Sequence, residues 1–507
     1  MSKKASPALY ELINSMSKSE KRYFKLFASR HTIGEENNYI RLFDFIESQN
    51  EFNDDAIYSN FKGEAFLNKF SITKNRLYEQ VMRSLGSYHS NSSSEAQIYR
   101  QLHGAEILYN KGLYEHAKRQ LNSAEKLAEK NDHTVLLREI ANHQKVLIET
   151  QGYKNHTESD LKKINQKDRE DQLKSNYYNE LWYLKSQLFT YMNSKGKSRS
   201  ENDINYFKSI YKSYKALEKP NTLGFELSYL TNHFESAYYF AVLDMVKSLE
   251  ALEKNLKLLK DTPKAIISSP NKYFSLLSNI IHLESAKGNY KQVHEYINEL
   301  KTFTTKYKIT TNEDLDIKLF SSINSTQLMV HIQRADFDKA VALEPIVEEG
   351  FRLYGEAITP LRKAYLSFNL AVAHFGVDDY NRSLFWVNTI LNDTKLDQKE
   401  DIIAFAQILN LIIHFELNHD QLLPYALKST MRFLKKRNRS YRFETVFLKH
   451  IRKISVASDR FEVEQLLNGI EDEINEIAND PFESVAFEYF DFKSWLQSKS
   501  KNRPFKV

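Results

Sequence analysis

Cysteine is absent from this chain of 507 residues. Without a thiol, the sequence excludes disulfides, thiolate zinc sites, iron–sulfur clusters and a cysteine nucleophile. Glycine and proline are scarce, with 13 and 9 residues. A chain of many short strands needs more of the turns that these two residues form. The scarcity therefore favours helices and predicts an all-α fold.

Long apolar runs are missing as well. No stretch approaches the roughly 18 apolar residues of a membrane span. The opening segment, "MSKKASPALYELINSMSK", has no apolar core of signal-peptide length. We therefore expect a cytoplasmic protein without a membrane partner. The 71 Lys and Arg nearly balance the 66 Asp and Glu, so the average charge indicates no particular partner.

Apolar residues are nonetheless plentiful, at 41% of the chain. This share is enough to bury a core, and the length suggests about three domains or one long array of repeats. Small and large residues in "YNKGLYEHAKRQLNSAEKLAEK", residues 109–130, recur at steps of three and four, which is the period of a helix face. The glycine interrupts this period where a turn would join two helices. The residues of the pattern are Ala105, Leu108, Gly112, Tyr114, Ala117, Leu121 and Ala124.

These seven positions resemble the tetratricopeptide (TPR) pattern of small, large, Gly, aromatic, Ala, large and Ala residues. Only the family's proline after the second helix is missing. Weaker copies follow in "ESAKGNYKQVHEYINEL", "IQRADFDKAVALEPIV" and "FGVDDYNRSLFWVNTIL", and Glu344 stands where the second of these should have a large apolar residue. Their aromatic residues, Tyr290, Phe337 and Tyr380, are 47 and 43 residues apart. These steps exceed the family's ~34 residues, so the helices or the loops are longer than usual.

The two ends of the chain carry a second resemblance. The opening "SKSEKRYFKLF" and the closing "FEYFDFKSWL" are similar to segments of TPR-like proteins of Bacteroidota-type bacteria. That resemblance implies a bacterial helical-repeat scaffold and no particular activity.

Three parts are expected along the chain. The Ser-rich stretch "GSYHSNSSSE", residues 86–95, predicts a boundary after an N-terminal helical domain, 1–90. In that domain, Ser17 and Glu20 form a capping box at a helix start. A TPR-like array, 96–453, would follow, and helices within 454–507 would cap it. The capping segment places Phe482, Val485, Phe487, Phe490 and Trp495 among acids.

The resemblance to TPR proteins implies an α-α superhelix whose concave groove binds a peptide or another protein. The register of the pattern places these residues on the groove: Glu106, Tyr109, Asn110, His282, Met329, Gln333, Val372 and Phe375. Families that clamp a C-terminal carboxylate use Lys together with Asn. Asn279 and Asn369 occur on these helices, but a matching set of lysines does not. We therefore expect a different ligand, held by mixed aromatic and polar contacts.

No catalytic or cofactor signature stands beside this pattern. Gly196-Lys197-Ser198 resembles the end of a phosphate-binding loop, but Tyr191 occupies the place of the required first glycine. His414 and His419 are five residues apart, whereas a zinc-binding helix needs a spacing of four. We expect no enzyme activity, no cofactor and no metal.

Charge is clustered near the C-terminus. Residues 428–453 hold ten Lys or Arg and one acid, whereas residues 459–491 hold eleven acids and one base. The acidic segment could pack beside the basic one and offset its charge, which is the interpretation we favour because adjacent repeats are neighbours. Alternatively, the basic face binds nucleic acid or another anion. Its central residues are Lys435, Lys436, Arg437 and Arg439.

A second class of function combines this basic face with basic residues of the N-terminal domain. Residues 64–85 could form a helix-turn-helix in which Thr73 caps a second helix that carries Lys74, Arg76 and Arg83. The protein would then be a nucleic-acid-associated regulator with the repeats as its sensor. Because any basic helical hairpin fits this description, we prefer the scaffold.

Overall fold

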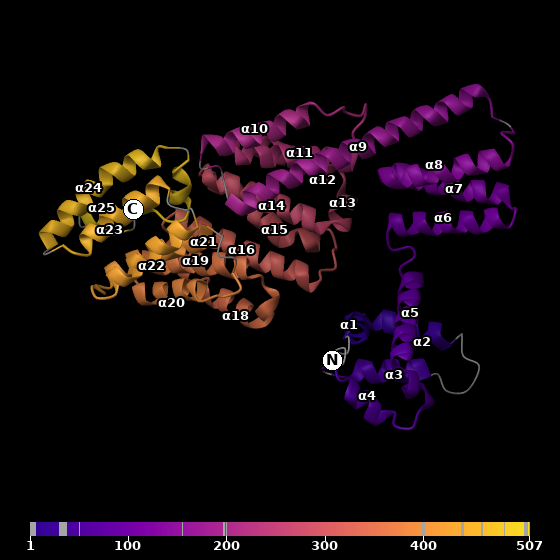
Figure 1. Cartoon of the computed structure of the whole chain (residues 1–507), viewed down its shortest axis with the longest axis horizontal. Coiled ribbons are helices and arrows are strands. Elements are labelled where there is room, and N and C mark those ends of the chain that lie inside the picture. The colour runs from indigo at the N-terminus through magenta and orange to yellow at the C-terminus, as the bar shows by residue number, and fades with distance from the viewer. Residues whose placement is uncertain are drawn as a thin grey trace. The chain divides into compact units, whose positions relative to one another are not determined.

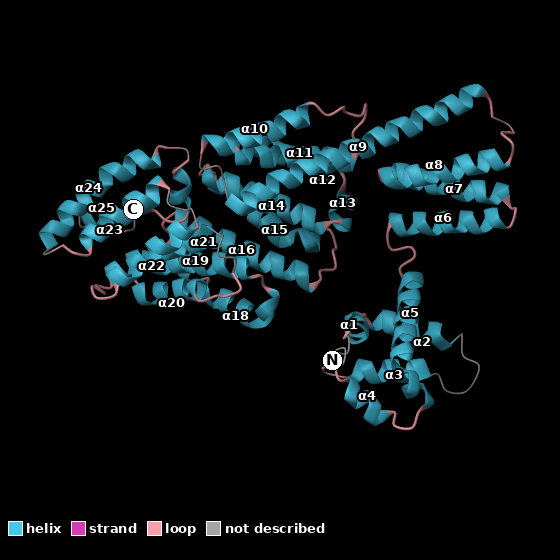
Figure 2. Ribbon diagram, viewed as in Figure 1, coloured by secondary structure: helices cyan, strands magenta, loops and turns pink. Residues whose placement is uncertain are grey.

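The computed structural model describes residues 7–29, 38–49, 51–154, 156–195, 198, 200–396, 401–437, 441–457, 460–480, 482–500 and 505. Helices, turns and loops make up these residues, and no strand occurs among them (Figure 2). The predicted all-α class is therefore confirmed. The chain divides into two compact units, Met1–Ser175 and Asn176–Val507. This division falls inside α9 (Glu158–Lys195), at a position that the sequence does not mark.

The first unit begins with helices packed around Phe24, Phe43, Leu77 and Val81. The predicted capping box is present at the start of α2, where the amide of Ser17 donates to Glu20 Oε2 at 2.6 Å. The elements are α1 (Ala8–Ser15), α2 (Lys18–Ser29), α3 (Asn38–Ser48), α4 (Asp54–Asn60), the 3₁₀ turn η1 (Ala65–Lys69) and α5 (Phe70–Tyr88).

A helical hairpin then follows the TPR-like pattern. It consists of α6 (Ser94–Asn110) and α7 (Tyr114–Lys130), and α8 (Thr134–Thr150) packs on α7. Ala105, Ala117, Leu121 and Ala124 are buried where these helices meet. The three alanines among them let the helix axes approach closely. Four of the seven residues from which the hairpin was predicted are thus buried at its interface.

The second unit is a succession of helical pairs (Figure 1). Neighbouring helices contact one another in the pairs α11–α12, α14–α15, α19–α20, α21–α22 and α23–α24, and α14, α16, α19 and α21 also contact in that order. The helices after α9 are α10 (Glu201–Lys215), α11 (Phe225–Ala241), α12 (Met245–Asp261), α13 (Pro263–Ser268), α14 (Pro270–Ala286), α15 (Tyr290–Lys306), α16 (Glu313–Gln333), α17 (Phe337–Val341), α18 (Glu344–Tyr354), α19 (Pro360–Gly376), α20 (Tyr380–Leu391), α21 (Asp401–Glu416), α22 (Leu423–Lys436), α23 (Arg442–Ile454), α24 (Arg460–Ala478) and α25 (Phe492–Ser500), with 3₁₀ turns η2 (Gly355–Ala357) and η3 (Ser484–Glu488).

One turn geometry recurs between paired helices. At Gly112 and Gly288 the backbone is left-handed, with φ of +72° and +74°. The next amide then donates to a carbonyl five residues earlier, as in the Schellman motif that ends many helices. Leu243, Ala335 and Asp378 adopt the same conformation without being glycine. A search for glycine therefore misses these turns, although the backbone repeats.

Gly376 closes α19 against Phe337 of α17. A Cβ at this position would lie 2.2 Å from Phe337 Cγ, so the whole ring would have to move. We expect Gly376→Ala to lower the free energy of unfolding by about 1–3 kcal/mol through overpacking, as measured by urea denaturation. Gly104→Ala is the matched control, because nothing lies near its Cβ and alanine favours a helix. Equal stability of the two variants would contradict the expectation.

The largest core of this unit reaches from Leu328 to the C-terminal segment. Phe490, Phe492 and Trp495, from the predicted capping segment, are buried in it. The side chain of Val485 lies outside the described residues. Glu416 at the end of α21 accepts hydrogen bonds from Trp495 Nε1 at 2.7 Å and Lys499 Nζ at 2.5 Å. These contacts attach α25 to α21.

Candidate functional site

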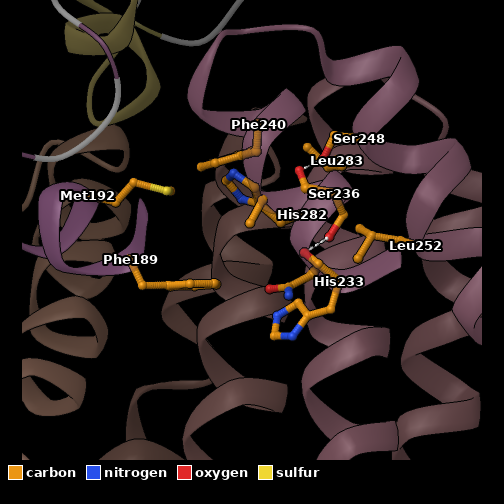
Figure 3. Close-up of a pocket in the computed structure, with 11 residues that line it drawn as sticks. Phe189, Met192, His233, Ser236, Phe240, Ser248, Leu252, His282 and Leu283 are labelled. Carbon is orange, nitrogen blue, oxygen red and sulfur yellow. Dashed lines mark hydrogen bonds between the residues drawn. The ribbon is translucent and has the colours of Figure 1, made fainter. Parts of the chain in front are cut away.

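The second unit contains a pocket of about 150 Å³ between four helices (Figure 3). Residues three or four apart on α9, α11 and α14 face the same way, and this spacing brings their side chains together. The pocket is mainly apolar, with a few polar groups. Its lining residues are Phe189 and Met192 of α9, His233, Ser236, Ala237 and Phe240 of α11, Ser248 and Leu252 of α12, and Asn279, His282 and Leu283 of α14.

Aromatic contacts hold the pocket walls. The Phe189 ring lies 5.5 Å from the His233 ring, and the Phe240 ring lies 6.1 Å from that of His282. Figure 3 shows Phe189 and Met192 extending toward the side chains of α11 and α14. The two serine hydroxyls of the lining donate to the backbone, Ser236 to the His233 carbonyl and Ser248 to the Ser236 carbonyl, both at 2.9 Å. The donor hydrogens of both serines are therefore used within the protein, whereas Asn279 is exposed at the pocket.

A lysine side chain influences the protonation of the pocket residue His233. Burial, together with the charge of Lys185, lowers the pKa of His233 to about 4, so this imidazole is neutral near pH 7. Burial also lowers the pKa of Lys185, and the charge of Lys272 lowers it further. Lys272 itself pairs with Glu226 at 2.7 Å. Lys185 thus interacts electrostatically with His233 of the pocket lining and with Lys272.

An aromatic strip on α9 continues from the pocket. Tyr178, Trp182, Lys185 and Phe189 follow at steps of four, three and four, so they share one face of the helix. Tyr178 is 42% exposed and Trp182 is 51% exposed. Large exposed aromatic side chains are typical of binding surfaces. Sequence reasoning missed this strip because α9 carries none of the TPR-like glycine or alanine signals.

The structure places the predicted groove residues in both units. Glu106, Tyr109 and Asn110 lie on α6 of the first unit. There the Tyr109 hydroxyl is 2.8 Å from that of Thr150. In the second unit, His282 lines the pocket. Met329 is half-buried on α16, and Gln333 Oε1 accepts a hydrogen bond from the Ser285 hydroxyl at 2.5 Å.

Val372 and Phe375 were wrongly assigned to a binding surface. They are only 2% and 1% exposed, so a ligand cannot reach them. The Phe375 ring packs against Phe490 and Phe505 at 5.2 and 5.3 Å. The C-terminal segment thus covers the face of α19 that the repeat register alone would leave open.

The predicted basic face extends over α22, the turn residue Arg437 and α23. Lys435 and Lys436 are exposed in the last turn of α22. The guanidinium of Arg437 lies 3.9 Å from the centre of the Phe433 ring. Arg439 lies outside the described residues. Exposed bases also lie on α23, where Lys449, Arg452 and Lys453 face solvent.

The acidic segment does contact the basic one at α23. Arg442 pairs with Glu476 at 2.7 Å. Glu483 accepts the backbone amides of Arg442 and Phe443 at 3.1 and 3.0 Å, where a carboxylate satisfies the open N-terminus of a helix. For α23, these contacts agree with the interpretation that the two segments offset each other.

The expected helix-turn-helix differs from the structure. Thr73 lies inside α5, which begins at Phe70, so it does not cap the helix. A 3₁₀ turn precedes α5, and Lys74 pairs with Asp54 of α4 at 2.9 Å. The ammonium of Lys74 is therefore engaged within its own domain, so it does not point toward a DNA groove.

Other sequence features lead to no site. Gly196 and Lys197 of the loop-like segment lie outside the described residues. Nδ1 of His414 and Nδ1 of His419 are 3.0 Å apart. In the described part of the chain, no cluster of three or more His, Asp or Glu side chains could bind a metal. Nor does any described helix combine the length and apolar character that a membrane span requires.

Comparison with known proteins adds no family. Neither a protein-family model nor a curated protein sequence matches this chain. The class that the structure defines is an all-α protein of many packed helices, compatible with a helical-repeat fold. The functional argument consequently rests on the pocket and on the surface around it.

Proposed function

We propose that this protein is a non-enzymatic scaffold in which a TPR-like superhelix binds a peptide or a segment of another protein. The pocket between α9, α11, α12 and α14 carries the proposal. It is formed largely by the first helices of successive pairs, and these are the helices that the TPR resemblance assigns to a concave groove. The recurring turn at Gly112, Leu243, Gly288, Ala335 and Asp378 supports a repeat architecture.

The pocket chemistry suits one apolar side chain of a partner. An apolar cavity of about 150 Å³ is large enough for a benzene-sized group. Phe189, Met192 and Phe240 supply apolar contact, and Asn279 is exposed at the pocket. Ligand sites commonly combine such walls with a few polar groups that fix orientation. This combination agrees with the mixed aromatic and polar recognition predicted from the sequence.

A tagged pull-down from the native cell lysate tests the scaffold. The wild type and Met192→Glu are compared after nuclease treatment, and retained proteins are quantified by mass spectrometry. We expect one dominant protein to survive nuclease and to decrease at least about tenfold with Met192→Glu, since a charge in an apolar pocket costs well over the 1.4 kcal/mol of a tenfold change. Val246→Glu is the matched control, because Val246 is 57% exposed on α12.

The opposite result would favour the nucleic-acid regulator. Only ribosomal or nucleoid proteins would be retained, nuclease would release them, and Met192→Glu would change nothing. Binding to DNA or RNA would then weaken steeply with salt, and Lys435→Glu with Lys436→Glu would abolish it. Because Arg442 of the basic segment is already paired with Glu476, part of the charge of that segment is offset, which favours the scaffold.

A further inference from the structure

Lys185 occupies an unusual position at the proposed groove. It lies between Trp182 and Phe189 on one face of α9 and is half-buried. Among the described residues, no carboxylate lies within ion-pairing distance of its ammonium. The cation Lys272 acts on it electrostatically, and Lys272 has a carboxylate partner of its own, Glu226, at 2.7 Å.

The positive charge of Lys185 therefore has no counter-charge among the described residues. A half-buried charge is costly unless a counter-charge or several hydrogen bonds compensate it. Burial and the like charge lower the pKa of Lys185, while its own charge helps to lower the pKa of His233. An anion placed beside Lys185 would relieve both effects. The same site therefore favours an acidic partner over a neutral or basic one.

We propose that the groove recognises an internal acidic segment of a partner protein, in which an Asp or Glu side chain pairs with Lys185 and a neighbouring apolar side chain fills the pocket. This inference rests on the proposed scaffold function and specifies its ligand. The acid and the apolar residue would be close in the partner's sequence, because Lys185 is one turn of α9 from Phe189 of the pocket lining. Charge complementarity would fix which segment enters.

The surface on both sides of Lys185 indicates an internal segment rather than a chain end. Toward the N-terminus of α9 lie the exposed aromatic rings of Trp182 and Tyr178. Toward its C-terminus lies the pocket with Phe189 and Met192. A bound chain can therefore continue in both directions from the acid. Aromatic side chains at such positions often contribute most of the binding energy.

A peptide library with blocked ends tests this ligand. Peptides of about nine residues span roughly 30 Å when extended, which is enough to cross three neighbouring helices at 8–10 Å each. The library is acetylated and amidated, each position is varied in turn, and binding to the full chain is measured by fluorescence anisotropy. We expect selection for Asp or Glu at one position and for Leu, Met or Phe within a few residues of it.

Lys185→Met then tests the contact itself, because methionine keeps an apolar stem and removes the charge. The selected peptide should bind this variant at least about tenfold more weakly than the wild type. The same peptide with Gln or Asn in place of the acid should bind both proteins equally. Lys257→Met is the matched control on the exposed part of α12. Circular dichroism and thermal unfolding verify that each variant is folded.

The outcomes separate this inference from the scaffold proposal. Blocked peptides that bind without an acidic preference, or that bind Lys185→Met as tightly as the wild type, overturn the acidic ligand and leave the scaffold intact. Binding only by peptides with a free C-terminal carboxylate also overturns it. If no peptide binds and the pull-down with Met192→Glu shows no difference, the scaffold proposal fails as well.

Discussion

Replacing Trp495 with alanine will destabilise the second unit more than any other single change considered for this chain. Trp495 is fully buried, and its ring lies 6.0 Å from Phe415 and 6.1 Å from Phe447. Its Nε1 also donates to Glu416 at 2.7 Å. One side chain thus joins α25 to α21 and α23.

The expected loss follows from cavity formation and from the broken hydrogen bond. Removing a buried Trp or Phe side chain typically lowers the free energy of unfolding by about 3–5 kcal/mol. Glu416 would keep its contact with Lys499, so its carboxylate would not be left without a partner. Urea denaturation followed by circular dichroism should show a lower midpoint for Trp495→Ala.

Trp182→Ala is the matched control, because it should leave stability almost unchanged and weaken peptide binding instead. Trp182 is 51% exposed on α9, so its removal should change the free energy of unfolding by no more than about 0.5 kcal/mol. The same change should weaken binding of the selected peptide, because Trp182 lies in the proposed groove. If the two variants lost stability equally, the docking of α25 would be wrong. If Trp182→Ala bound normally, the strip would not contribute to recognition.

The second large effect is expected at Glu344, which stands where the repeat pattern calls for an apolar residue. Glu344 lies in the first turn of α18, and its side chain is only 14% exposed. Its Oε1 accepts hydrogen bonds from Arg382 Nε at 2.6 Å and Trp386 Nε1 at 2.7 Å, and its Oε2 lies 3.0 Å from His374 Nε2. The charged exception is therefore a buried network that joins α18, α19 and α20.

Glu344→Ala should lower the free energy of unfolding by about 2–4 kcal/mol, somewhat less than the ~3–5 kcal/mol of a fully buried pair because Arg382 is a third exposed. Arg382 also keeps its second partner, Glu348. Glu348→Ala is the control, since its side chain is 47% exposed and surface ion pairs contribute about 1 kcal/mol at most. Similar losses in both variants would contradict the central role of Glu344.

The pH dependence of this loss has a definite sign. Burial alone would raise the pKa of Glu344, but the hydrogen bonds from Arg382 and Trp386 outweigh it and hold the pKa below the ordinary 4.5. A carboxylate with a lowered pKa stabilises the fold fully above its unfolded value and loses this contribution as the pH falls through the folded value. The difference between wild type and Glu344→Ala should thus be constant above pH 4.5 and shrink below it. A difference that grew on acidification would refute this assignment.

Much of the local structure could be predicted from the sequence. The steps of three and four at Ala105, Ala117, Leu121 and Ala124 identified a buried helix face, and Ser17 with Glu20 identified a helix start. Both signals involve residues within a few turns of one another, so the chain encodes them locally. The left-handed turn at Leu243 was not recognised because a residue other than glycine adopts it.

Only part of the candidate site could be predicted from such local patterns. His282, which was predicted for the groove, lines the pocket. Val372 and Phe375 had the same kind of signal, yet both are buried, and the C-terminal segment packs on Phe375. Trp182 and Lys185 had no signal, because an exposed aromatic and a lysine on a long polar helix look like ordinary surface. The search for lysines that could clamp a carboxylate covered only the first helices of the recognised repeat copies. Because α9 belongs to none of these copies, Lys185 was not considered.

By itself, the sequence determined the helical class and the periodic faces, because both follow from side-chain size and polarity repeated at the helical period. Only the tertiary structure decided which of those faces stay open. Burial of Phe375 depends on Phe490 and Phe505, more than 100 residues away. The cationic site at Lys185 likewise depends on Lys272 of another helix. Such proximity is set by how helices pack, and no local pattern in the chain specifies it.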